Sequence, residues 1–186
     1  MPEQVAITDA DVPPGTIVLF DFDGTLSKKD SLFPFLRFTL GFMGVVRTVL
    51  LSAPWLLGYG LHLISNNTAK ARLLKVAFAK RSGTELQEQG RMFAQTIVPY
   101  LLRPDMMARV VAYKKRGCCC VLVSASLDFY LKPWAQAEGI EVVLCSSLQS
   151  DNHGRITAGF CGNNCHGEEK VRRIRNFLQE RGISAS

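Results

Sequence analysis

Two carboxylates, Asp21 and Asp23, stand two residues apart directly after a short apolar run, Thr16 to Phe20. In a partly dry crevice, two acids this close repel each other unless a cation lies between them or one is protonated. A magnesium ion would keep Asp21 ionised as a nucleophile toward phosphorus. A protonated Asp23 could donate a proton and later act as a base. The alternative interpretation of the same residues is an Asp-Gly turn on an acidic surface.

The residues around this pair could bind an anion. Gly24 permits a tight turn, and Thr25 offers a hydroxyl and a backbone N–H group to a phosphate oxygen. Much later in the chain, Ser124 follows another apolar run and Lys170 opens a helical pattern. Taken singly, a Ser at a strand end is usually a helix cap and a helical Lys is usually a solvated surface residue. Ser124 and Lys170 indicate a functional site only because they occur in one chain together with the acid pair.

The elements that must position these residues predict a parallel α/β sheet. Thr16 to Phe20 and Cys118 to Val123 are short apolar runs typical of buried strands, and helical patterns lie between them. Parallel strands need such crossover connections, and their carboxyl ends form a crevice at one edge of the sheet. Further elements are expected as helices at 104–116, 127–138 and 167–181 and strands at 140–144 and 155–160.

The sequence DFDGTL after a hydrophobic strand resembles the nucleophile motif of the haloacid dehalogenase superfamily of aspartyl phosphotransferases. Ser124 resembles its second motif, in which a hydroxyl and the following backbone N–H groups, here from Ala125 onward, bind the phosphoryl group. Lys170 resembles its third motif, a lysine that neutralises the nucleophile and the phosphoryl oxygens. The resemblance implies a Rossmann-like core and a Mg²⁺-dependent phosphomonoester hydrolase, with Asp21 and Asp23 as catalytic residues and as metal ligands.

The insertion between the first two motifs lies where the phosphoserine-phosphatase-like branch carries an α-helical cap. We therefore expect a core from residues 14–30 and 103–186 and a cap from residues 31–102, which we call the cap below. Caps close over the site and supply substrate contacts. Asp30 occupies a position where phosphoserine phosphatases usually carry a Glu that contacts the substrate amino group. Asp30 could equally be a helix N-cap.

The fourth motif of the superfamily, an acidic cluster that supplies further magnesium ligands, is not found after Lys170, where Glu180 is the only acid. The C-terminal part of the core is therefore expected to be missing, and magnesium binding and turnover are expected to be weak. Two alternatives remain open from the sequence. One is an inactive phosphate-binding pseudoenzyme or fragment, and the other is a phosphotransferase to an acceptor other than water.

Composition sets wider bounds. A chain of 186 residues with 47% hydrophobic residues can bury a substantial core, and its net charge of +6 favours anionic partners, here a small phosphorylated substrate. The polar N-terminus and the clustered cysteines favour free thiols in the cytoplasm. Structural zinc is disfavoured because paired Cys clusters are lacking. The basic C-terminal residues lack aromatic interleaving, which disfavours nucleic acid. Oligomeric state and physiological substrate stay open.

One segment is unusually apolar. Residues 48–64 carry no formal charge, but Pro54, Gly58 and Gly60 interrupt the run. Because a spanning helix needs about 20 apolar residues, we expect a buried pair of cap helices rather than contact with a membrane.

Overall fold

The structure is a computed structural model that describes residues 12–183 of the chain. The first eleven residues, on which the cytoplasmic expectation partly depends, lie outside this range. Three parallel strands form the central sheet in the order β1-β2-β3: β1 (Ile17–Phe20), β2 (Cys119–Leu127) and β3 (Val142–Ser146). Val18 pairs with Cys120, and Leu122 pairs with Val143. The prediction of a parallel α/β sheet is confirmed.

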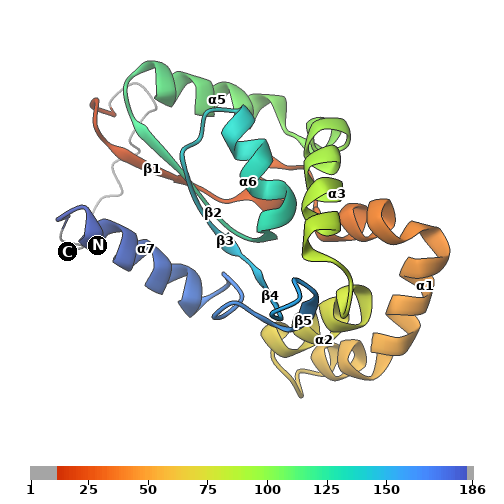
Figure 1. The fold of residues 1–186 in the computed structure, drawn as a ribbon. Coiled ribbons are helices and arrows are strands. Elements are labelled where there is room, and N and C mark those ends of the chain that lie inside the picture. Colours follow the sequence, from red (N-terminus) through yellow and green to blue (C-terminus); the bar gives the residue numbers. More distant parts are fainter. Residues whose placement is uncertain (1–11, 184–186) are drawn as a thin grey trace.

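Helices cover both faces of the sheet (Figure 1). On one face lie α5 (Pro104–Lys115) and α6 (Asp128–Ala137), and on the other lies α7 (Glu168–Glu180). Alternate residues of β2 serve the two faces, as the pleat requires. Cys120 and Leu122 join the larger core, whereas Val121 and Val123 pack in a smaller cluster with Phe177 of α7.

The strand β2 runs further than its apolar residues indicate. The sequence predicts its end at Val123, but Leu127 still pairs with Ser146 after a register shift. The polar residues 124–126 therefore lie within a distorted strand at the sheet edge rather than in a loop beyond it. This irregularity follows from local hydrogen bonding, since the N–H group of Ser126 donates to Oγ of Ser124 at 3.1 Å.

The cap contains the helices α1 (Leu32–Gly60), α2 (Asn66–Phe78), α3 (Gly83–Thr96) and α4 (Val98–Leu101). The helix α1 is kinked at Gly41, where φ is 68°, a value that L side chains rarely adopt. Aromatic side chains join the cap to the core, because Phe35 and Phe93 both contact the ring of Tyr130 in α6.

Two further features tie the cap to the core. At Gly90 of α3 an added Cβ atom would lie 2.1 Å from the carbonyl oxygen of Phe129, so the two helices approach as closely as backbones allow. The two segments in which the chain passes between core and cap also bond to each other, and we call this contact the crossing. Ser27 bridges Leu102, and the N–H group of Arg103 donates to the carbonyl oxygen of Leu26 at 2.8 Å.

A small antiparallel hairpin follows the central sheet. Its strands are β4 (Leu148–Ser150) and β5 (Ile156–Phe160). The hairpin lies beside α2 (Figure 1). The N–H group of Lys80 donates to the carbonyl oxygen of Ile156 at 2.9 Å, so this hairpin supports the cap from the core side.

The expectation of a buried cap-helix pair is wrong for α1. This helix is long and apolar enough to cross a membrane by length and composition, yet only 11% of its most apolar window is buried. It forms the outer edge of the cap (Figure 1). The sequence pattern measures how apolar a helix is, but it does not show whether a neighbouring element covers it.

Candidate active site

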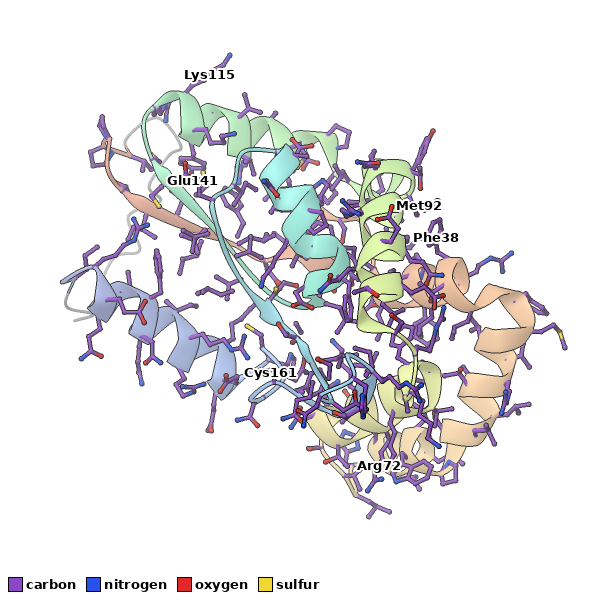
Figure 2. The ribbon with its side chains drawn as sticks, in the orientation of Figure 1. Phe38, Arg72, Met92, Lys115, Glu141 and Cys161 are labelled. Carbon is purple, nitrogen blue, oxygen red and sulfur yellow. The ribbon has the colours of Figure 1, made fainter. Side chains whose placement is uncertain are left out.

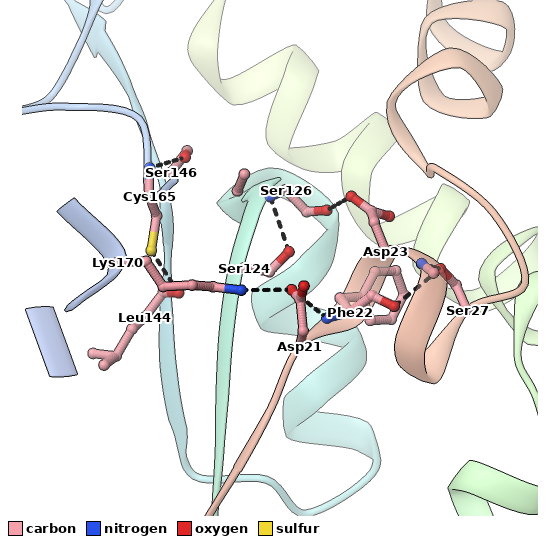
Figure 3. Close-up of polar contacts among 12 residues, drawn as sticks. Asp21, Phe22, Asp23, Ser27, Ser124, Ser126, Leu144, Ser146, Cys165 and Lys170 are labelled. Carbon is pink, nitrogen blue, oxygen red and sulfur yellow. Dashed lines mark hydrogen bonds and ion pairs between the residues drawn. The ribbon is translucent and has the colours of Figure 1, made fainter. Parts of the chain in front are cut away.

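Asp21 directly follows β1 and lies at the carboxyl edge of the sheet. Its Oδ1 atom accepts a hydrogen bond from the N–H group of Phe22 at 2.8 Å. The same oxygen lies 3.0 Å from the ammonium nitrogen of Lys170, in the first turn of α7 (Figure 3). The side chain of Asp21 is 42% exposed. The carboxylate is therefore oriented by two donors and is still accessible from solvent.

The segment Phe22–Leu26 forms a tight turn that directs Asp23 away from Asp21. The turn closes through a hydrogen bond of 2.9 Å from the N–H group of Ser27 to the carbonyl oxygen of Phe22. Gly24 adopts a φ of 77°, which explains why glycine suits this position. Phe22 and Leu26 are fully buried and anchor the turn in the core.

Asp23 belongs to a buried hydrogen-bond network. One carboxylate oxygen accepts from the N–H group of Ser31 at 2.9 Å. The other accepts from the hydroxyl of Ser126 at 2.6 Å (Figure 3). The hydroxyl of Ser31 bonds in turn to Oγ of Ser126 at 3.1 Å and to the phenol of Tyr130 at 2.8 Å. The network joins the cap, β2 and α6 around a single acid.

The surroundings of Asp23 favour its protonated form. Burial raises the pKa of Asp23 above its ordinary value, while the hydrogen bonds from Ser126 and Ser31 oppose this shift in part. Burial also raises the pKa of Tyr130, so its phenol stays neutral. Asp23 is thus suited to donate a proton, whereas Asp21 lies beside a cation.

Ser124 and Ala125 lie at the register shift in β2. Ser124 is buried, and its Oγ atom orients the N–H group of Ser126. The carbonyl oxygen of Ala125 accepts a hydrogen bond of 2.7 Å from the ammonium of Lys70, in α2 of the cap. Burial lowers the pKa of Lys70, with Asp30 and Asp23 opposing the shift. A cap lysine therefore reaches the core segment in which the sequence predicts phosphate binding.

A cavity of about 370 Å³ contains most of these residues. Its polar walls and its apolar cap wall are formed by Asp21, Asp23, Asp30, Ser124, Ala125, Lys170, Leu56, Tyr59, Lys70 and Leu73, among others. Of the predicted site residues only Thr25 does not line it. A larger hollow of about 1060 Å³ lies along α7, but neither acid of the pair lines it.

Asp30 lies one residue before the N-cap of α1, which is Ser31, so the N-cap alternative is wrong. It lines the cavity, and its Oδ1 atom accepts a hydrogen bond of 2.8 Å from the N–H group of Leu32 at the start of α1. This hydrogen bond orients the side chain, and Asp30 is itself exposed. The geometry thus leaves it available for a contact with substrate.

Sequence reasoning missed four residues of this site. Ser31, Ser126 and Tyr130 complete the network around Asp23, and Lys70 reaches the site from the cap. Ser126 had a detectable signal, since it follows Ser124 by two residues in an extended segment. The others come from distant helices, and nothing in their local sequence distinguishes them.

Asp21 and the main chain of Asp23 are the groups here that could hold a magnesium ion, and such an ion would be held weakly. Within residues 12–183, no three His, Cys, Asp or Glu side chains converge in a way that could hold a metal. Both carboxylate oxygens of Asp23 are engaged by protein donors, which leaves its main chain as the candidate ligand. Mg²⁺ is commonly held by one or two carboxylates and completes its shell with water and substrate phosphate oxygens. Asp21 suits such a site.

The chain is similar in sequence to known proteins over most of its length. A family model described as haloacid dehalogenase-like hydrolase matches residues 18–186. Protein CicA of Caulobacter vibrioides (strain NA1000 / CB15N) is 35% identical over 167 residues, covering 87% of this chain and 72% of that protein. A histidinol-phosphatase of Neisseria meningitidis serogroup C (strain 8013) is 25% identical over 169 residues, covering 89% of this chain and 75% of that protein.

Solved structures share the fold. A protein of unknown function from Bordetella pertussis Tohama I matches with a TM-score of 0.75 at 22% identity, over 93% of this chain and 78% of that one. A substrate-bound phosphoserine phosphatase complex matches with a TM-score of 0.61 at 12% identity, over 93% and 75% of the two chains. Together with the match to the family model and to CicA, these findings show that the chain belongs to the haloacid dehalogenase-like hydrolase family.

Proposed function

We propose that the chain is a Mg²⁺-dependent phosphomonoester hydrolase that acts through an aspartyl-phosphate on Asp21. The observation that carries this proposal is the contrast between two acids in one cavity. Asp21 lies beside Lys170 and is accessible, whereas Asp23 is enclosed with a raised pKa. Acids whose environments differ in this way can divide nucleophilic and acid–base roles between them. The relationship to a histidinol-phosphatase supports the same class of reaction.

The first half of the reaction uses both acids. A carboxylate oxygen of Asp21 forms a bond to phosphorus while the bond from phosphorus to the ester oxygen breaks. Asp23 donates its proton to the departing alkoxide. The hydroxyl of Ser124, the N–H group of Ala125 and the ammonium of Lys170 hold the phosphoryl oxygens. Asp21 and the main chain of Asp23 would hold magnesium, which would supply positive charge to offset the negative charge of the phosphoryl oxygens.

The second half restores the protein. Asp23, now a carboxylate, takes a proton from water as that water attacks the phosphorus of the aspartyl-phosphate. The bond to Asp21 breaks, and inorganic phosphate leaves. An alcohol bound in the place of this water could attack in the same way, and the phosphoryl group would then pass to that acceptor.

Phosphoenzyme trapping tests the proposal. The protein is mixed with Mg²⁺ and p-nitrophenyl phosphate, quenched in acid and analysed by peptide mass spectrometry. We expect one added phosphoryl group on the peptide that holds Asp21, and we expect Asp21→Asn to lose both this adduct and turnover. Asp105→Asn, which changes an exposed acid paired with Arg103, serves as the matched control. Turnover that survives in Asp21→Asn would refute the assignment of the nucleophile. Binding of phosphate without turnover by the unaltered protein would favour the pseudoenzyme.

A further inference from the structure

The outer surface of α1 exposes large hydrophobic side chains. Of the residues that the structure describes, sixteen are exposed large hydrophobics, and ten of these lie between Phe33 and Leu63. The most exposed part, which we call the apolar face, consists of Phe42, Met43, Leu50, Leu51, Leu57 and Leu61. Each of these is more than half exposed. Exposed large apolar side chains that gather on one element usually mark an interaction site.

Before the kink at Gly41, α1 buries Leu32, Phe35 and Leu36, but after the kink its two buried residues are both polar. Thr48 and Ser52 are buried, although Met43, Leu50 and Leu57 lie exposed at a seven-residue spacing on the opposite side of the helix. Oγ of Ser52 has no hydrogen-bond partner in the structure. A helix at the surface of a water-soluble domain has the reverse arrangement, with its apolar stripe toward the core. Small polar residues inside and large apolar residues outside are typical of helices that contact lipid.

Charge distinguishes between the possible occupants of this face. Residues 31–84 of the cap hold seven Lys or Arg residues and no Asp or Glu, a net charge of +7 compared with +6 for the whole chain. Arg37 and Arg47 are exposed on α1 itself, and Arg72 extends over the ring of Trp55 at 5.5 Å from α2. Figure 2 shows Arg72 at the cap end of the molecule, far from Lys115 and Glu141. An anionic partner complements this surface. A second copy of the chain would place another cationic cap against it.

We infer that the apolar face of α1 docks onto a lipid bilayer that carries anionic headgroups, with the helix lying in the plane of the interface. In-plane docking suits a helix with apolar side chains on one face and cations beside it. Insertion across the bilayer would remove a wall of the active-site cavity, because Leu56 and Tyr59 of α1 line it together with Lys70 of α2. Docking in the plane keeps this wall in place and brings it next to the lipid headgroups.

Vesicle flotation tests the docking surface. The protein is centrifuged with vesicles of phosphatidylcholine alone and of phosphatidylcholine with phosphatidylglycerol, at low and at high salt. We expect flotation with the anionic vesicles, weaker flotation with the neutral ones, and a loss of the difference at high salt, because salt screens exposed charges. The triple variant Met43→Gln, Leu50→Gln, Leu57→Gln should bind at least about tenfold more weakly.

The matched control changes three exposed hydrophobic residues elsewhere: Met92→Gln, Tyr100→Gln and Val111→Gln. This variant should float like the unaltered protein. Circular dichroism and thermal melting should show all three proteins folded, since every substituted side chain is exposed. Equal binding by the two triple variants, or an unaltered protein that stays with neither vesicle, overturns the inference.

Two further outcomes also overturn it. A dimer in light scattering that only the α1 variant dissociates would place a second copy on the face. Protein that stays with vesicles in alkaline carbonate would indicate a spanning helix. Neither failure touches the proposed hydrolysis, because trapping of the phosphoenzyme uses a soluble substrate.

Discussion

The ammonium nitrogen of Lys170 lies 3.0 Å from Oδ1 of Asp21, although α7 and β1 are at opposite ends of the chain. The same oxygen also accepts a hydrogen bond from the N–H group of Phe22, so two donors fix the orientation of the Asp21 carboxylate. In the proposed reaction the same cation faces both the nucleophile and the phosphoryl oxygens. This places the largest share of charge stabilisation that the protein itself supplies on Lys170.

Replacing Lys170 should therefore affect catalysis far more than stability. We expect Lys170→Met to lower kcat/KM for p-nitrophenyl phosphate by about a hundredfold or more, as the loss of a positioned donor at a developing charge usually does. The melting temperature should hardly change, because ion pairs with access to solvent contribute little to stability. Steady-state kinetics and thermal denaturation measure the two effects. Lys132→Met, which changes an exposed lysine near Asp128, is the control, and equal losses in both variants would contradict the role.

The leaving group should reveal whether Asp23 acts as the acid. A p-nitrophenolate departs without help, whereas an alkoxide needs a proton. Asp23→Asn should thus reduce hydrolysis of an alkyl phosphate much more than hydrolysis of p-nitrophenyl phosphate. The ratio of kcat/KM for the two substrates is the measurement. A variant that loses the same factor on both would assign Asp23 a structural role instead.

Asp23 should also leave a signature in the pH dependence of stability. Its raised pKa means that the folded protein holds this proton more tightly than the unfolded chain. The carboxyl's contribution is therefore complete below its unfolded pKa and is lost as the pH rises through the higher folded value. Relative to Asp23→Asn, the unaltered protein should become less stable as the pH rises above the unfolded-state pKa of about 4. Urea unfolding at several pH values, in the presence of a chelator, measures this difference, and a constant difference would exclude the shift.

The hydrogen bond from Ser126 should affect the pKa of Asp23. Its hydroxyl donates to Asp23 at 2.6 Å and lowers the pKa of that carboxyl. Ser126→Ala should raise this pKa further and move the alkaline limb of the kcat/KM profile to higher pH, because the acid then stays protonated longer. Ser146→Ala removes another buried hydroxyl, one bonded to Asn164, and should cost similar stability without moving that limb. An unmoved limb in Ser126→Ala would show that another group sets it.

Gly90 should be sensitive to the smallest substitution. A Cβ atom there meets the backbone of Phe129 at 2.1 Å, so Gly90→Ala must push α3 away from α6. We expect a loss of about 3 kcal/mol in the free energy of unfolding, at the upper end of the range for overpacked cores. Gly60→Ala at the end of α1 meets no atom within 4 Å and should be neutral. Urea denaturation of both variants checks the contrast, and a neutral Gly90→Ala would mean that the two helices separate freely.

The sheet and three of its motifs were predictable because their signals are local. One apolar run is followed by DFDGTL and another by Ser124. Both patterns place polar groups at the carboxyl edge of the sheet, and neither depends on contacts with distant parts of the chain. The network around Asp23 was not predictable. Ser31 and Tyr130 approach it only after the cap and α6 have packed together. The exposure of α1 escaped prediction for a related reason, since burial depends on neighbours that a hydropathy pattern does not contain.

The hydrogen bond from the N–H group of Ser31 to Asp23 spans the border between cap and core. Only a few residues separate that border from the crossing where Ser27 bridges Leu102. Any swing of the cap about this crossing changes the distance between the donor and the acid. In the proposed reaction, a movement of the cap that admits a substrate would also displace a hydrogen bond that orients the proton donor Asp23, so a mutation in this crossing is expected to change both substrate admission and proton transfer.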